Sequence, residues 1–134
     1  PLYSSAASDV YKRQVVGILP DQDPGRGAGA FAPFFGRDAY TMTLVARLAQ
    51  RSGAQVFTVF GERLQRGRGY RIRWQRVEPD IASPDLHTSV SALNRAVERR
   101  VRECPSQYQW SYKRFKTTPD GLPSPYGRGQ AAGR

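Results

Sequence analysis

Residues 105–116 of this 134-residue chain read PSQYQWSYKRFK and mix aromatic rings with cations. The run follows directly on a long amphipathic segment that ends near Cys104. In such a run the rings can pack into a core while the cations face an acidic partner. An aromatic-rich helix cap with solvated lysines is the simpler interpretation on composition alone.

The overall composition restricts the class of protein. A chain of 134 residues fits one domain, and its formal net charge of +10 suits an anionic partner such as nucleic acid, acidic lipid headgroups or an acidic carrier protein. The single Cys104 excludes an intrachain disulfide framework, and the single His87 excludes a multi-histidine metal site. We therefore expect no metal, and no run approaches the roughly 20 apolar residues that span a bilayer.

The first residues look foreign to the rest of the chain. Residues 4–14 read SSAASDVYKRQ, which resembles a conceptual translation of a transposase-type sequencing adapter. The segment lacks the apolar centre of a signal peptide. We expect residues 1–14 not to be native, and we expect Val15 to continue a chain whose preceding part lies upstream.

From Val15 onward the apolar pattern predicts a series of strands and helices. We expect a buried parallel strand at residues 15–20, an extended segment at 30–35 and a helix at 41–52 capped by Thr41. A central strand is expected at 55–62, and a half-buried strand at 70–75 pairs with it as a hairpin. A second helix, at 83–104, starts with Ser83-Pro84-Asp85.

These elements predict an α/β protein with a partial mixed sheet and flanking helices. The ordered domain is expected to span residues 15–116. Residues 117–134 are rich in Pro, Gly and Ser with little to bury, so we expect a disordered tail.

Two carboxylates, Asp21 and Asp23, follow the first predicted strand. Ligands of open α/β sheets bind at the carboxyl ends of strands, which places both acids well for chemistry. An ordinary acidic turn is an equally good interpretation, because Asp-Pro-Gly is a common turn sequence.

Three ordered blocks of the chain are similar to a known family. The blocks are a PDxD loop with a glycine-rich stretch and PFFG at residues 20–36, the helical segment at 39–53, and QYxWxYKRF within residues 105–116. Together they resemble the bacterial lipid A biosynthesis acyltransferases of the lysophospholipid acyltransferase superfamily, from Val15 to about Tyr126. The resemblance implies the C-terminal part of a glycerolipid acyltransferase-like fold.

The resemblance also implies roles for individual residues. Asp21 corresponds to an acid that lines the active site, and a structural role falls to the rings of Tyr108, Trp110 and Phe115. Substrate binding is expected of four further residues: Asp23, Arg26, Lys113 and Arg114.

By resemblance, the whole enzyme moves a fatty acyl chain from acyl carrier protein to a hydroxyl of a phosphorylated glycolipid, the lipid A precursor. It would do so without a cofactor, at the cytoplasmic face of the bacterial inner membrane. The family's general base is the histidine of a His-x4-Asp/Glu motif, and His87 is followed by Ser91 and Ala92 at the places of the acid. We therefore expect the dyad and the membrane anchor upstream, and this chain to be inactive alone.

Two other stretches of the sequence suggest binding functions, one for a dinucleotide and one for nucleic acid. Residues 25–30 match a GxGxxA dinucleotide fingerprint, but Phe31-Ala32-Pro33 follows where a helix should open, so we reject nucleotide binding. The Arg/Gly turn at residues 66–69, with the Tyr/Trp run, leaves a small basic nucleic-acid-binding module as the alternative function. A solvated hairpin tip and contact with anionic lipid are further interpretations of that turn.

Overall fold

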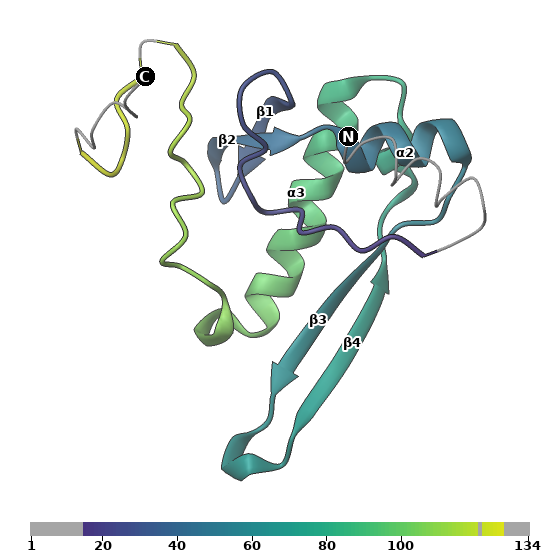
Figure 1. The fold of residues 1–134 in the computed structure, drawn as a ribbon, viewed down its shortest axis with the longest axis vertical. Helices are drawn as coiled ribbons and strands as arrows, with labels where there is room; N and C mark the ends of the chain where they lie inside the picture. Colours follow the sequence, from purple (N-terminus) through teal and green to yellow (C-terminus); the bar gives the residue numbers. More distant parts are fainter. Residues whose placement is uncertain (1–14, 121, 128–134) are drawn as a thin grey trace.

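The computed structural model describes residues 15–120 and 122–127 (Figure 1). Its strands are β1 (Gly29–Phe34), β2 (Arg37–Met42), β3 (Phe57–Arg63) and β4 (Tyr70–Arg76), and its α-helices are α2 (Leu44–Ser52) and α3 (Leu86–Glu103). Short 3₁₀ turns occupy Gln65–Gly67, Pro79–Ala82 and Pro105–Gln107. The predicted α/β class is confirmed, with the strands arranged as two antiparallel pairs.

The first pair, β1–β2, runs from Gly29 opposite Met42 to Phe34 opposite Arg37. Ala32, Phe34 and Ala39 are buried, because α3 packs against this pair. The extended segment predicted around Pro33 is confirmed as β1, whereas β2 was not predicted.

Helix α3 follows its sequence pattern closely. Val90, Leu93, Val97 and Val101 recur at helical spacing and are all buried. The capping residue is Asp85 rather than Ser83, since the Asp85 carboxylate accepts a 2.8 Å hydrogen bond from the Thr88 N–H.

Helix α2 begins at Leu44, three residues after the predicted start. Thr41 is the penultimate residue of β2 and is fully buried, so it does not cap the helix. The predicted end is confirmed: Gly53 has φ +66°, and its N–H donates to the Ala49 carbonyl at 2.9 Å. A left-handed residue at this position favours glycine.

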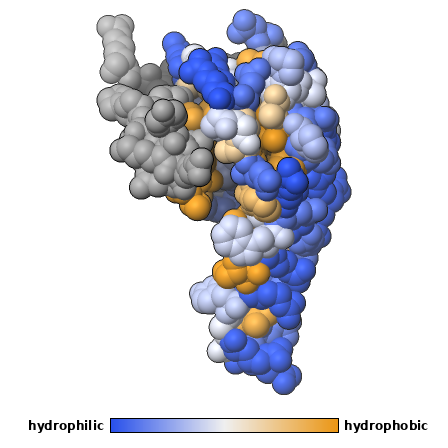
Figure 2. All heavy atoms as spheres, turned by 90° about the vertical axis from the view of Figure 1, so that its right-hand side faces the viewer, coloured by the Kyte–Doolittle hydropathy of each residue, from blue (hydrophilic) through white to orange (hydrophobic). Residues whose placement is uncertain are grey.

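The second pair, β3–β4, forms the predicted hairpin, from Phe57 opposite Arg76 to Arg63 opposite Tyr70. The expectation that β3 is a central strand buried on both faces is wrong. Phe57 is 47% exposed, and the predicted half-buried face of β4 is also open, with Trp74 66% exposed. Figure 1 shows the hairpin projecting from the body, and Figure 2 shows apolar side chains on its surface between hydrophilic ones.

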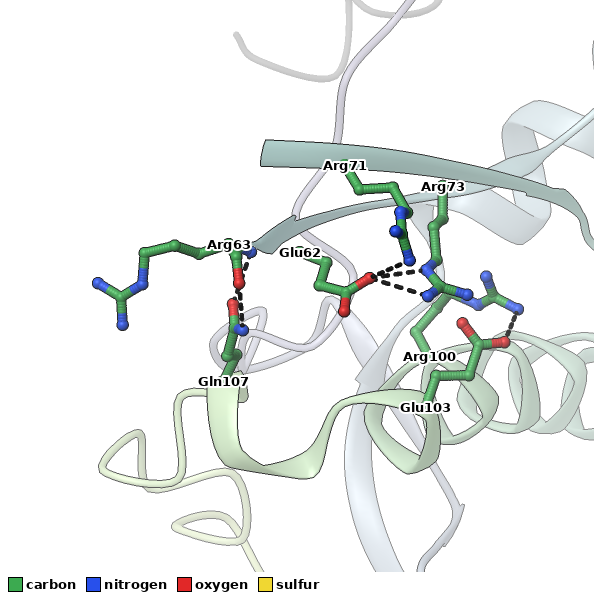
Figure 3. A network of polar contacts seen from close by, with 7 residues as sticks. All are labelled: Glu62, Arg63, Arg71, Arg73, Arg100, Glu103 and Gln107. Atoms are coloured by element: carbon green, nitrogen blue, oxygen red, sulfur yellow. Dashed lines mark hydrogen bonds and ion pairs between the residues drawn. The ribbon is translucent and has the colours of Figure 1, made fainter. Parts of the chain in front are cut away.

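Polar contacts lie on the other face of the hairpin, and a further pair joins Arg63 to the body (Figure 3). Within the hairpin, Glu62 accepts from Arg73 Nη2 at 2.8 Å and lies 3.6 Å from Arg71 Nη1. The Arg63 N–H donates to Gln107 Oε1 at 2.8 Å, and Gln107 Nε2 donates back to the Arg63 carbonyl at 2.9 Å. The hairpin is therefore fixed on one side and bare on the other.

The strand predicted at residues 15–20 is not formed. Residues 15–19 have neither helix nor strand in the described structure, and Val15 and Leu19 are exposed. A strand needs a partner for its backbone groups, and neither strand pair adds these residues as a third member. Ile18 nonetheless packs on the core.

The buried apolar residues form two clusters. The first lies between α2, residues 77–81 and α3, and contains Val45, Ala49, Val77, Ile81, Ala92, Leu93 and Ala96. The second lies between β1–β2, the end of α3 and residues 105–117, which we call the closing segment. It contains Phe34, Ala39, Val97 and Val101, with Phe35, Tyr108 and Phe115 packed on it.

Candidate functional site

Residues 20–25, which we call the acid loop, are tied to the closing segment through Asp23. The Asp23 N–H donates to Tyr112 Oη at 2.7 Å, and Thr117 Oγ1 donates to Asp23 Oδ2 at 2.6 Å. The second carboxylate oxygen, Oδ1, accepts the Gly25 N–H at 2.9 Å and closes a tight turn. Both oxygens of Asp23 are thus engaged within the chain.

Asp21 is partly buried and lies near the Tyr108 hydroxyl. Burial above all, and then the Asp21 carboxylate, raise the pKa of Tyr108. The phenol therefore keeps its proton at neutral pH and can serve as a hydrogen-bond donor toward a carboxylate.

Arg114 is the buried cation of the closing segment, with 3% of its surface exposed. Its Nη1 donates to the Tyr40 carbonyl at 2.7 Å, its Nη2 donates to Thr41 Oγ1 at 2.9 Å, and its guanidinium lies 5.4 Å from the Phe34 ring centroid. Burial lowers the pKa of Arg114, whereas the negative charges of Asp21 and Asp23 act in the opposite direction. The acid loop therefore supplies counter-charge for a buried arginine.

Asn94 completes this polar core. Its Nδ2 donates to the Ala32 and Pro33 carbonyls at 3.2 and 3.1 Å and lies 2.9 Å from Thr41 Oγ1. Arg114 Nη2 lies 3.4 Å from Asn94 Oδ1. These groups are hydrogen-bonded to one another in a buried position, although Arg114 Nε has no partner among the described residues. They thereby fix the register between β1, α3 and the closing segment.

Sequence reasoning missed four of these polar partners: Thr41, Asn94, Tyr112 and Thr117. A signal existed for Asn94, which shares the helical spacing of Val90, Val97 and Val101 and so had to face the core. No local signal marked Thr117.

The other predicted site residues lie outside the buried polar network of Arg114 and Asn94. Trp110 is exposed, its Nε1 donates to the Pro105 carbonyl at 2.7 Å, and its ring meets Tyr108 edge-on at 4.8 Å. The Phe115 ring lies 6.1 Å from that of Phe34 in the second cluster. Lys113 is exposed, with Nζ 6.0 Å from the Tyr126 ring. The sole histidine, His87, is exposed in the first turn of α3.

Arg26 is exposed beside Arg47 in a shallow depression at the start of α2. The glycine-rich stretch leads from there into β1 rather than into a helix, unlike a dinucleotide fingerprint. Its last glycine, Gly29, is needed for space: a Cβ there would lie 2.8 Å from both Pro24 Cγ and the Thr41 carbonyl oxygen. The acid loop and β2 can approach each other this closely only because residue 29 has no side chain.

No helix within residues 15–120 and 122–127 is both long and apolar enough to cross a bilayer. The interpretations of residues 1–14 as adapter and of residues 117–134 as a disordered tail stay predictions. Residues 1–14 lie wholly outside the described residues. Of the second segment, residues 117–120 and 122–127 are described, with contacts such as that of Thr117.

Comparison with known proteins gives one consistent result. The family model described as "Bacterial lipid A biosynthesis acyltransferase" matches residues 4–117. The chain is 36% identical over 118 residues to the lipid A biosynthesis lauroyltransferase of Escherichia coli, and 34% identical over 118 residues to the palmitoleoyltransferase of the same organism. Each alignment covers 86% of the chain.

The lipid A biosynthesis myristoyltransferase of E. coli is 34% identical over 112 residues, which cover 82% of the chain. The chain spans 38% of the length of the first two relatives and 34% of the third. The resemblance carried by the PDxD, PFFG and QYxWxYKRF blocks is thereby confirmed, and the chain belongs to the bacterial lipid A biosynthesis acyltransferase family.

Proposed function

We propose that the chain is the C-terminal part of an acyltransferase that moves a fatty acyl group from acyl carrier protein to a hydroxyl of a lipid A precursor. The observation that carries this proposal is the meeting of two separate family-like blocks. Asp23 of the PDxD loop is hydrogen-bonded to Tyr112 of the QYxWxYKRF block and to Thr117 just after it.

In the proposed reaction, Asp21 is a supporting active-site acid and not the general base. The general base is the histidine of an upstream His-x4-Asp/Glu motif, whose acid orients it toward the acceptor hydroxyl. His87 is exposed, and Ala92 stands five positions later, where the motif has its acid. The chain alone should therefore catalyse no acyl transfer.

A phosphorylated acceptor suits the cations near the acid loop. Arg26 and Arg47 line one depression at the start of α2, and Lys113 is exposed on the closing segment. Arginine presents a planar fork of donors that matches phosphate oxygens. The guanidinium of Arg114 is already bonded to Tyr40 and Thr41, so phosphate binding falls first to Arg26 and Lys113, and Asp23 contributes mainly by shaping the loop.

The excess of positive charge also suits an acidic carrier protein and the anionic cytoplasmic face of the inner membrane. Single-stranded RNA is the competing partner, because the exposed Tyr70 and Trp74 stand among arginines on the hairpin.

A chimeric enzyme tests the proposal. Residues 15–127 replace the matching region of the E. coli lauroyltransferase, and acyl transfer from acyl carrier protein to a lipid A precursor is measured. We expect turnover in the chimera, none in residues 15–127 alone, and a loss of about 10-fold or more for Asp21→Asn in the chimera.

Lys116→Gln serves as the matched control for a charge change near the site, because Lys116 is exposed over the Tyr112 ring and has no assigned role. Turnover by residues 15–127 alone would disprove the assignment of the general base. Submicromolar binding of single-stranded RNA at physiological salt, with no binding to carrier protein or lipid, would overturn the proposal in favour of the nucleic-acid module.

A further inference from the structure

The acid loop has little internal structure to hold its shape. Residues 22–25 include one turn closed by the Asp23 carboxylate, and the chain before them is irregular. A loop of this kind reaches a single conformation only when other parts of the fold fix it. The fixing contacts come from a segment about 90 residues later in the sequence.

Two hydroxyl groups of the closing segment make these contacts. The Tyr112 hydroxyl accepts the Asp23 N–H, and the Thr117 hydroxyl donates to the Asp23 carboxylate, so backbone and side chain of one residue are held together. Both bonds are short, at 2.7 and 2.6 Å, and the second is made to a charged acceptor.

The closing segment is itself anchored in the core and can therefore transmit rigidity. Arg114 lies between Tyr112 and Thr117 and is bonded to the Tyr40 carbonyl and to Thr41. Phe115 packs on the second apolar cluster. The two hydroxyls thus project from a rigid element toward the acid loop, and Asp21 lies two residues from the residue that they hold.

We propose that Tyr112 and Thr117 are positioning residues, which hold Asp23 and thereby set the place of the Asp21 carboxylate. The inference rests on the proposed function, in which Asp21 is the active-site acid. Among the described residues, neither of the two is hydrogen-bonded to Asp21 itself. Loss of either hydroxyl should therefore lower the rate of the chemical step without weakening substrate binding.

The first test uses the chain itself. Amide hydrogen exchange is followed by NMR in Tyr112→Phe, with Tyr70→Phe as the matched control, because Tyr70 is 70% exposed on the hairpin. Exchange of the Asp23 amide should become about 5–10-fold faster in Tyr112→Phe and stay unchanged in Tyr70→Phe. Unchanged exchange in Tyr112→Phe would show that Tyr112 does not hold the loop.

The second test uses the chimera and separates kcat from KM. Thr117→Val should lower kcat by about 10- to 100-fold with little change in KM, and Thr117→Ser, which keeps the hydroxyl, should restore it. Thr118→Val is the control, since the Thr118 hydroxyl donates to the Leu122 carbonyl and not to the acid loop. The unfolding midpoint of each variant shows whether a loss of rate is a loss of fold.

The two proposals fail in different ways. An active chimera whose kcat is indifferent to Tyr112→Phe and Thr117→Val refutes the positioning role and leaves the proposed function intact. An inactive chimera removes the proposed function and with it the catalytic purpose of the pair, whereas amide exchange still decides whether the pair holds the loop.

Discussion

The two strand pairs have the same antiparallel geometry but opposite surroundings. In β1–β2, Ala32 and Ala39 are fully buried and Phe34 is 2% exposed. In β3–β4, Ile72 and Trp74 are more than half exposed although both are large hydrophobic residues. The difference lies in the cover, since α3 and the closing segment pack on the first pair, whereas the hairpin has described cover on one face only. Residue type predicts a strand, and the rest of the fold decides what it buries.

The polar groups of the two pairs differ in the same way. Around β1–β2, Asn94 and Arg114 are buried and bonded to backbone carbonyls. On the hairpin, Glu62 meets Arg71 and Arg73 at a partly exposed site. Surface ion pairs stabilise a fold little, whereas a buried polar group that loses its partner destabilises it strongly. Substitutions in the two regions should therefore differ in effect.

The largest contrast is expected between two phenylalanines. Phe34→Ala removes a ring from the second cluster and should lower the free energy of unfolding by about 3–5 kcal/mol. Phe57→Ala removes a half-exposed ring from the hairpin and should cost less than about 1.5 kcal/mol. Urea denaturation measures both values. Equal losses would mean that the hairpin face is covered in solution.

The next contrast compares neighbouring cations of the closing segment. Arg114→Met leaves the Tyr40 carbonyl and the Thr41–Asn94 pair without their donor and should destabilise the fold by about 2–4 kcal/mol. Lys113→Met changes an exposed side chain and should stay within about 0.5 kcal/mol. If the two variants unfold at the same urea concentration, Arg114 is not the anchor of the closing segment.

A smaller, pH-dependent effect is expected at the joint between the hairpin and α3. Hydrogen bonds from Arg99 and then Arg95 lower the pKa of Glu78 below its ordinary value of 4.5. A depressed pKa contributes stability above the unfolded pKa, which is lost as the pH falls through the lower folded value.

Melting temperatures of the natural chain and of Glu78→Gln should accordingly differ above pH 4.5 and converge below it. A constant difference across this range would mean that the Glu78 charge contributes nothing. Glu103→Gln, which alters an i, i+3 pair with Arg100 elsewhere on α3, is the control at the same charge.

The smallest effect is expected on the bare face of the hairpin. Ile72→Thr and Trp74→Thr each place a β-branched residue in β4 and remove exposed apolar surface, so stability should change by less than about 0.5 kcal/mol. Solubility, measured as the soluble fraction after concentration, should rise. Strong destabilisation by either change would contradict the contrast between the two pairs.

The sequence predicted those elements whose residues show a clear apolar periodicity or a turn signal of their own. The stripe Val90, Leu93, Val97 and Val101 predicted α3, and the Arg/Gly turn between apolar runs predicted the β3–β4 hairpin. β2 escaped prediction because Asp38-Ala39-Tyr40 shows little alternation, so Thr41 looked like a helix cap. The apolar run at residues 15–20 wrongly predicted a strand, because the sequence does not show whether a partner strand is present to pair with it.

The candidate site was predicted in its parts but not in its assembly. The family-like blocks pointed to Asp21, Asp23 and Arg114 as residues of one predicted site. The bond from Thr117 to Asp23 joins residues 94 positions apart, which no spacing rule reaches. The burial of Arg114 was likewise hidden, because its partners lie on β2 and α3.

The bond between Thr117 and Asp23 also has a consequence for how the chain is made. The acid loop leaves the ribosome before its fixing partner, because Thr117 lies 94 positions later in the sequence than Asp23. Helices and hairpins can form as they emerge, but a contact of such long range must wait until Thr117 has been made. A message cut short just before codon 117 would therefore yield a chain with both apolar clusters, whose acid loop has lost one of its two ties.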